Sequence, residues 1–250
     1  MSFVPVVHSE WLKIRTVRSL PLSLLAAFLA TAGFSLLMSG SFNAEQVAEP
    51  GFDPLRAAFY GLNFGAIGAL CFGALAVAGE YKTGGIRSSL AAVPRRGVFY
   101  AAKLAVVAVL TFAVGLVTSL ICFLAGQALL SGQGVSLGLG DPGTVRAVVG
   151  CALYLTLIAV MATGLTTASR SAPMVIGLLI PFMVMLSFVA GDITDEGNVF
   201  TDFFPDRAGQ QILLQNSEGT LGPWTGVGVL ALWTGAAVWA GWSALHRRDA

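Results

Sequence analysis

Two stretches of the sequence contain residues that could bind a nucleotide or a metal, but neither completes its motif. Gly138, Gly140 and Gly143 have the spacing G-x-G-x-x-G, yet a dinucleotide site needs this motif between a strand and a helix of a βαβ unit. The stretch DITDEGNVFTDF, residues 192–203, begins like a calcium-binding loop but has Phe203 where a bidentate glutamate is required. We therefore expect no cofactor and no metal to be bound by this chain.

The residue types used in catalysis are scarce and scattered. No Walker A sequence occurs, so we expect no ATP bound in the P-loop manner. His8 and His246 lie near the two ends of the chain, without the hydroxyl or thiol and carboxylate partners of a triad. Cys71, Cys122 and Cys151 fall in apolar stretches, which is typical of packing residues. A membrane-embedded enzyme is therefore disfavoured.

The composition indicates a membrane protein. Of the 250 residues, 56% are hydrophobic and 11% are charged, whereas about a quarter of the residues of a soluble domain are charged. Six intervals without Asp, Glu, Lys or Arg are each at least 21 residues long, which is enough for a helix to cross a bilayer core of about 30 Å. We predict an all-α integral membrane fold, a single transmembrane domain over residues 1–250, with six transmembrane helices. They are expected near 20–40, 57–78, 104–129, 146–168, 172–190 and 223–245.

The distribution of charge predicts the orientation. If both termini lie on one side of the membrane, that side carries eleven basic and three acidic residues, and the other carries three basic and ten acidic residues. Cytoplasmic loops are enriched in Lys and Arg. We therefore expect both termini to be cytoplasmic, in a bacterial cytoplasmic membrane.

The interiors of the predicted spans contain no Asp, Glu, Lys or Arg. Ion-coupled carriers and proton pumps commonly retain such residues within their spans, because charge there is costly and kept for function. Among Asp, Glu, Lys and Arg, only Arg146 falls within the six predicted spans, at the first position of the fourth. We therefore do not expect an ion gradient bound within this chain to be its energy source.

Residues 4–18, which precede the first predicted span, have helical periodicity. Val4, Val7, Trp11 and Ile14 fall on one helical face, and basic residues occupy the rest. This pattern predicts an amphipathic helix lying on the membrane surface. The alternative is a disordered basic leader that serves only as a topology signal.

The span near 57–78 contains four small residues at four-residue spacing. Gly61, Gly65, Ala69 and Gly73 would form a smooth stripe that lets another helix approach closely. That helix could belong to the same chain or to a second copy.

Residues 191–222 form the longest predicted outer loop. It contains an apolar patch, VFTDFFP, and a candidate short helix, RAGQQILLQ. A loop of about thirty residues with such content is expected to fold back as a re-entrant segment on the outer membrane face.

Residues 79–97, GEYKTGGIRSSLAAVPRRG, interrupt two apolar stretches. We predict a short helix here, capped by Thr83 and ended by Pro94, with apolar residues at positions i, i+4 and i+7. An amphipathic helix of this kind can insert into a groove of a soluble partner or lie on lipid. The apolar ridge consists of Ile86, Leu90 and Val93.

Three segments carry a family resemblance. SEWLKIRTVRS (9–19), the 79–97 segment and FFPDRAGQQIL (203–213) together resemble the membrane subunits of bacterial ATP-binding-cassette exporters, more narrowly type-2 permeases of actinobacterial kind. The likeness covers essentially the whole chain, from the leader through six spans to the final outer loop. It implies an assembly of two permeases, identical or paralogous, with two separate ATPase subunits that bind ATP and Mg.

The resemblance also implies that residues 79–97 couple the permease to the ATPase. Gly85 follows Gly84 in this chain, where such families often have threonine, so the start of the helix departs from their pattern. The positions that match the family's acidic-aromatic, Thr-Gly, basic and proline residues are Glu80, Tyr81, Thr83, Gly84, Arg87 and Pro94.

These observations predict a permease that exports an amphipathic or lipophilic compound such as a drug, an antibiotic or a peptide, because the spans offer apolar and aromatic groups and few polar ones. The alternative is a non-transporting membrane anchor or sensor component with a permease-like fold. The expected partners are ATP-binding-cassette ATPase subunits, a second permease copy and membrane lipid, without nucleic acid. The candidate substrate-path residues are Phe59, Tyr60, Asn63, Phe64, Met174, Phe182 and Met185.

Overall fold

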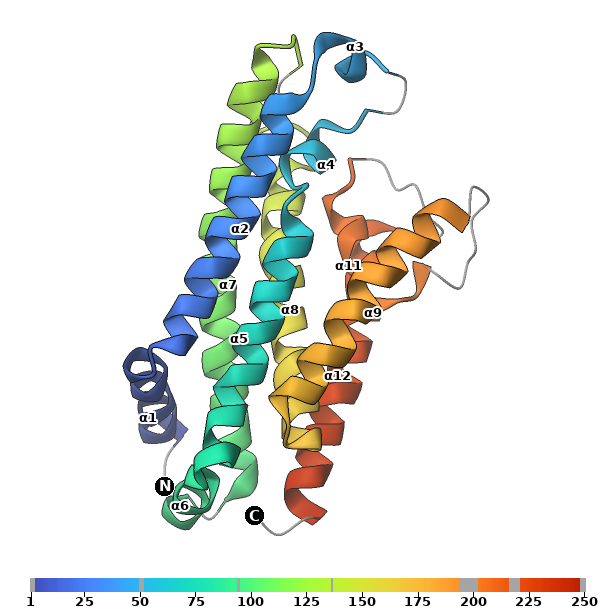
Figure 1. Cartoon of the computed structure of the whole chain (residues 1–250). Helices are drawn as coiled ribbons and strands as arrows, with labels where there is room; N and C mark the ends of the chain where they lie inside the picture. The colour runs from blue at the N-terminus through green and yellow to red at the C-terminus, as the bar shows by residue number, and fades with distance from the viewer. Residues whose placement is uncertain are drawn as a thin grey trace.

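The computed structural model of the chain describes residues 3–49, 52–93, 95–135, 137–193, 202–215 and 221–247. Every secondary-structure element in these ranges is a helix. The long helices lie side by side in one bundle, and both chain termini lie at the same end (Figure 1). This end is termed the terminal end, and the opposite end the distal end.

Within the described residues, five helices are long and apolar enough to cross a membrane. A further helix, α9 (Ala172–Ile193), contains Pro181 and contributes a shorter apolar stretch, Ala172–Met183, so the sixth span stays a prediction. The five long helices are α2 (Ser19–Ser41), α5 (Leu62–Thr83), α7 (Arg96–Ser131), α8 (Thr144–Ser169) and α12 (Pro223–Arg247).

Short helices occupy both ends of the bundle (Figure 1). At the terminal end, α1 (Phe3–Thr16) covers most of the segment predicted to be an interfacial helix, and α6 (Gly85–Ala92) lies between α5 and α7 in the sequence. At the distal end are α3 (Ala44–Val47) and α4 (Pro54–Ala58).

Two helix boundaries differ clearly from the predicted spans. The helix predicted near 57–78 is interrupted, because a turn separates α4 from α5. The short helix α4 has its own N-terminal cap, since the Asp53 side chain accepts hydrogen bonds from the backbone N–H groups of Leu55 and Arg56. The helix predicted near 104–129 begins eight residues earlier, at Arg96. It continues through Lys103 because the charge of this residue is paired within the protein.

The centre of the bundle is α8, which packs against α5, α7 and α12. A glycine lies at each of these three contacts. Gly73 of α5 lies against Ala159, Gly115 of α7 lies against Ala152, and Gly164 of α8 lies against Ala237 of α12. Small residues let helix backbones approach closely where lipid supplies no hydrophobic driving force between helices.

The stripe of small residues on α5 contacts two different helices of the same chain. Gly61 and Gly65 lie against Thr31 of α2, whereas Gly73 lies against Ala159 of α8. Residues four apart on an α-helix advance by about 40°, so the stripe turns by roughly 120° between its first and last members. It therefore closes two helix contacts within this chain.

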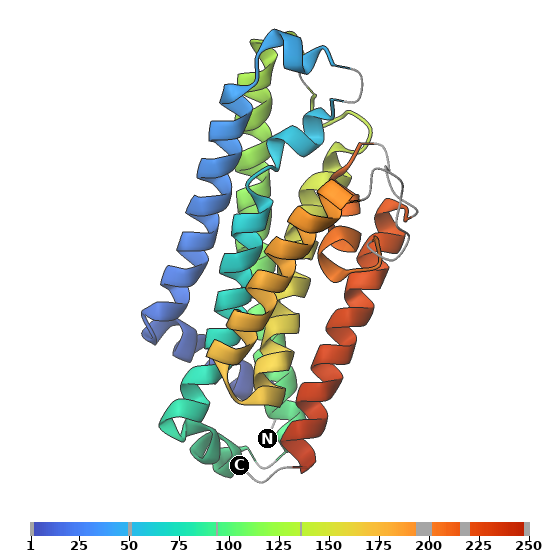
Figure 2. The same cartoon turned by 45° about the vertical axis from the view of Figure 1, so that its right-hand side comes forward.

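Part of the predicted outer loop packs into the distal half of the bundle. The helix α11 (Pro205–Gln210) and the 3₁₀ turn η1 (Gln211–Leu213) pack against α8 and α12, and Figure 2 shows α11 beside α12. The Tyr154 hydroxyl donates to Asp206 at 2.5 Å, and both side chains are buried. Residues 194–201 and 216–220, which include most of the candidate calcium loop, lie outside the described residues.

Candidate functional site

Four charged side chains meet at the terminal end, where α1, the end of α5 and the start of α7 come together. The Lys103 Nζ lies 2.5 Å from Glu10 Oε2 and 2.9 Å from Glu80 Oε1. The Lys13 Nζ lies 2.6 Å from Glu10 Oε1 and 2.8 Å from Glu80 Oε1. These four residues, termed the charge cluster, form a ring in which each lysine contacts both glutamates.

The charge cluster is neutral and largely buried. Glu10 is 3% exposed and Lys103 is 4% exposed. A buried charge is costly unless it is paired and hydrogen-bonded, and here each buried charge faces two groups of the opposite sign. Both ammonium groups also lie over the Phe99 ring, at 5.6 Å for Lys13 and 5.3 Å for Lys103, where the ring face attracts a cation.

The charge cluster raises the pKa of Lys13. Burial by itself lowers the pKa of this lysine, because it disfavours the charged form. The hydrogen bonds to Glu10 and Glu80 and their negative charges outweigh that effect, so the pKa lies above its ordinary value. Lys13 is therefore held in its charged form.

The charge cluster also reaches α6. The Lys13 Nζ donates a hydrogen bond to Ser89 Oγ at 3.2 Å. One connected set of polar contacts thus joins α1, α5, α6 and α7. Of its members only Glu80 was predicted as a site residue, since no spacing rule relates Glu10 to Lys103, 93 residues later.

The apolar residue Ile86 attaches α6 to its own chain. Ile86 is 5% exposed and shares a small core with Phe99, Tyr100 and Leu245, to which Val93 adds a partly buried contact. The ridge was predicted to face a partner or lipid, and this stays a prediction for Leu90, whose side chain lies outside the described residues. The structure shows that Ile86 anchors α6 to the bundle, leaving Ser88 exposed.

The junction between α5 and α6 is formed by Gly84. Its φ of 70° is left-handed, which glycine adopts without steric cost, and it both ends α5 and begins α6. Thr83 is the last residue of α5 and not a cap of α6, in contrast to the prediction. The side chains of Thr83, Arg87 and Leu90, and Pro94 as a whole, lie outside the described residues.

Tyr81 ties the end of α5 to the corner between α8 and α9. Its hydroxyl donates a hydrogen bond to the Thr167 carbonyl at 3.4 Å. The Arg170 guanidinium lies 5.7 Å from the ring centre. Neighbouring Glu80 and Tyr81 therefore link α5 to two different parts of the bundle.

The candidate path residues in and just before the first turn of α5 divide between the core and the surface. Phe59 is 3% exposed and belongs to the core. Tyr60, in the turn before α5, and Asn63 and Phe64, in the first turn of α5, are all exposed. The Phe64 ring lies 4.5 Å from that of Phe34 on α2.

Asn63 and the path residues of α9 lie close to the segment around α11. Asn63 Oδ1 accepts a hydrogen bond from Gln210 Nε2 of α11 at 2.8 Å, and the Phe182 ring lies 5.6 Å from that of Phe204. Met174 is exposed near the other end of α9. The Met185 side chain lies outside the described residues.

The family of the chain follows from a comparison with family models. Residues 6–191, more than half of the chain, match the model described as ABC-2 family transporter protein. The chain belongs to this family. It is thus a membrane permease of the ABC-2 type, a family that implies association with ATP-binding-cassette subunits. No curated protein sequence matches the chain.

All four residues of the charge cluster lie inside the matched part of this ABC-2 permease, as do α6 and the exposed face of α5. The match ends within α9, before α11 and α12. Within the described residues, no group of three or more His, Cys, Asp or Glu could hold a metal ion.

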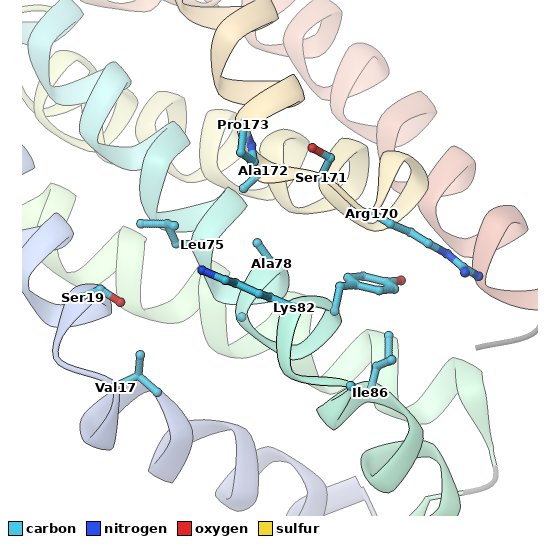
Figure 3. Close-up of a pocket in the computed structure, with 13 residues that line it drawn as sticks. Val17, Ser19, Leu75, Ala78, Lys82, Ile86, Arg170, Ser171, Ala172 and Pro173 are labelled. Atoms are coloured by element: carbon cyan, nitrogen blue, oxygen red, sulfur yellow. The ribbon is translucent and has the colours of Figure 1, made fainter.

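A groove of about 730 Å³ opens at the terminal end of the permease (Figure 3). Its floor is the last turns of α5, with Leu75 and Ala78. The corner between α1 and α2 forms one wall, and the corner between α8 and α9 forms the other. Val17 and Ser19 lie on the first wall, and Ser171 and Pro173 lie on the second.

Proposed function

We propose that the chain is the transmembrane subunit of an ATP-driven exporter that moves an amphipathic or lipophilic compound, such as a drug, an antibiotic or a peptide, out of the cell. The observation that carries this proposal is the attachment of α6. This helix is anchored through Ile86 and linked to α1, α5 and α7 through the charge cluster. A force applied to α6 would therefore be transmitted to two long helices.

In this proposal the energy comes from separate ATPase subunits, which bind ATP and Mg. They contact the side of α6 that carries Ser88, which is exposed. The charge cluster then keeps α1, α5, α6 and α7 moving as a unit. A second permease copy, identical or paralogous, completes the assembly, and the two permeases rock between inward- and outward-facing states.

The proposed orientation places the terminal end in the cytoplasm of a bacterial cell. The support is the charge asymmetry, eleven basic and three acidic residues against three basic and ten acidic ones. Residues 79–97 would then face the ATPase, with Glu80 and Tyr81 acting from inside the bundle and Gly84 setting the direction of α6.

The substrate class is inferred from the exposed residues at the distal start of α5. Tyr60 and Phe64 offer aromatic surface, and Asn63 offers an amide beside them. Phe182 of α9, whose ring lies 5.6 Å from that of Phe204, would extend this surface, and Met174 and Met185 stay candidate path residues. Aromatic and thioether groups with few polar atoms suit an amphipathic ligand.

The test is a cross-linking and transport experiment on the complex of the full chain with its ATPase. We expect Ser88→Cys to cross-link to the ATPase and Ser41→Cys, equally exposed at the distal end, not to do so. In proteoliposomes, candidate amphipathic compounds should stimulate ATP hydrolysis and be transported. A complex that assembles but neither responds to nor moves any compound would favour the anchor or sensor alternative.

A further inference from the structure

The groove at the terminal end has the character of a lipid site. We propose that it binds one anionic phospholipid, whose headgroup phosphate contacts Lys82 and whose acyl chain lies along the apolar floor. This inference requires a membrane-embedded chain but does not depend on transport. It rests on the charge, the depth and the shape of the groove.

The charge of the groove is positive. Lys82 and Arg170 line it, and none of its lining residues is Asp or Glu. The nearest carboxylate in the sequence, Glu80, is engaged by Lys13 and Lys103. Among the described residues Lys82 forms no ion pair and is exposed, so its charge is available to an anion.

The two cations do not act alike. Figure 3 shows the Lys82 amine directed toward Leu75 and Ser19, whereas the Arg170 guanidinium points to the opposite side. Arg170 also stacks on Tyr81. The direct contact to the phosphate is therefore assigned to Lys82, with the Ser19 hydroxyl on the same side of the groove.

The depth of the groove matches the boundary between headgroups and acyl chains. Ser19 is the first residue of α2, and Lys82 lies in the last turn of α5. Lysines at span ends extend toward the interface while their aliphatic stems remain in apolar surroundings. Leu75 and Ala78 continue the groove into the apolar part of α5, as an acyl chain requires.

The shape of the groove distinguishes a site from general attraction of lipid. Helix corners wall it on both sides, and its volume of about 730 Å³ is within the usual range of ligand pockets, about 300–1,000 Å³. A basic side chain near an anionic leaflet gains roughly fivefold in binding. General attraction of this kind does not saturate at one lipid, whereas a groove with walls on both sides holds a single lipid and therefore saturates.

The test uses the purified full chain in detergent micelles that contain either phosphatidylglycerol or phosphatidylcholine, with bound lipid counted by native mass spectrometry. We expect saturable binding of one phosphatidylglycerol per chain, and weaker binding of phosphatidylcholine. Lys82→Gln should weaken binding by about fivefold, and Lys82→Arg should retain it. Arg15→Gln, a matched loss of charge at an exposed position of α1, should change it less than twofold.

A second variant tests the groove independently of charge. Ala78→Trp would fill the floor and abolish the single bound lipid, whereas Leu178→Trp on the exposed side of α9 would not. Equal binding of the two lipids, or an unchanged Lys82→Gln variant, would overturn the proposal. Displacement of the lipid by glycerol 3-phosphate would also overturn it, because the ligand would then be a soluble phosphate. An Ala78→Trp variant that changes the oligomeric mass but not the lipid count would overturn it as well, because a second copy of the chain would then cover the groove.

Discussion

Lys103 and Glu10 are 93 residues apart in the sequence, yet their side chains form a buried ion pair with an Nζ–Oε2 distance of 2.5 Å. Through this pair α1 is joined to α7, and through Glu80 both are joined to α5. The helix α1 is therefore part of the bundle and not only a surface attachment. The pair also explains why α7 can extend through a lysine.

Removing one charge of this pair is expected to destabilise the protein strongly. Lys103→Met would leave Glu10 and Glu80 with only Lys13, and breaking a buried pair from one side costs about 3–5 kcal/mol. The midpoint of thermal unfolding in detergent should fall markedly. Arg95→Met, at an exposed position of the same end, is the control and should have little effect.

A double-mutant cycle tests whether the cost comes from the unpaired charge. Glu10→Gln combined with Lys103→Met restores the neutrality of the charge cluster. The double variant should therefore be more stable than the sum of the two single effects predicts. The difference should be at least about 1 kcal/mol, which is within the range found for directly contacting residues. Simple additivity would show that the two residues do not interact in the folded protein.

The attachment of α6 through Ile86 leads to a different prediction. Ile86→Asp would place a charge among Phe99, Tyr100 and Leu245, so α6 should detach from the bundle. We expect substrate-stimulated ATP hydrolysis to be lost. A cysteine introduced by Ser89→Cys should then become reactive toward a thiol reagent. Ser88→Asp, on the exposed side of the same helix, should leave the reactivity of position 89 unchanged while weakening ATPase association. If both variants behaved alike, Ile86 would not be the anchor.

How far the sequence predicts this structure depends on which force dominates each feature. Long charge-free intervals coincide with the apolar helices because the transfer of apolar side chains into lipid depends on composition alone. The pairing of Glu10 with Lys103 could not be predicted, because it depends on how α1 folds back onto α7. The burial of Ile86 was missed for a related reason, since periodicity identifies an apolar face but not the surface that covers it.

Close packing of α5 against α8 predicts a sharp difference between two glycines. A methyl group at Gly73 would overlap the backbone of Ala159, whereas a methyl group at Gly33 of α2 meets nothing within 4 Å. Gly73→Ala should therefore lower the unfolding midpoint, because overpacking typically costs about 1–3 kcal/mol. Gly33→Ala should raise it slightly, since alanine is favoured over glycine in a helix by about 1 kcal/mol. Equal effects of the two substitutions would contradict the observed α5–α8 contact.

The raised pKa of Lys13 predicts a loss of stability in alkaline solution. Its folded-state pKa lies above the ordinary value of 10.5 because Glu10 and Glu80 favour the charged form over the opposing effect of burial. The stabilisation is therefore fully present below pH 10.5 and is lost as the pH rises through the higher folded-state pKa. Lys13→Met should lack this alkaline component of the unfolding curve, and Lys82→Met should keep it. An identical alkaline decline in both variants would exclude Lys13 as its source.

The orientation can be tested in intact cells with a membrane-impermeant thiol reagent. Glu45 lies on α3 at the distal end and Ser88 lies on α6 at the terminal end, and both are exposed. With the terminal end in the cytoplasm, as the excess of basic residues there predicts, Glu45→Cys should react from outside and Ser88→Cys should react only after permeabilisation. Cys122 and Cys151 are buried and should remain unlabelled in both cases. If Ser88→Cys reacted in intact cells while Glu45→Cys did not, α6 would face away from any cytoplasmic ATPase and the proposed coupling would be impossible.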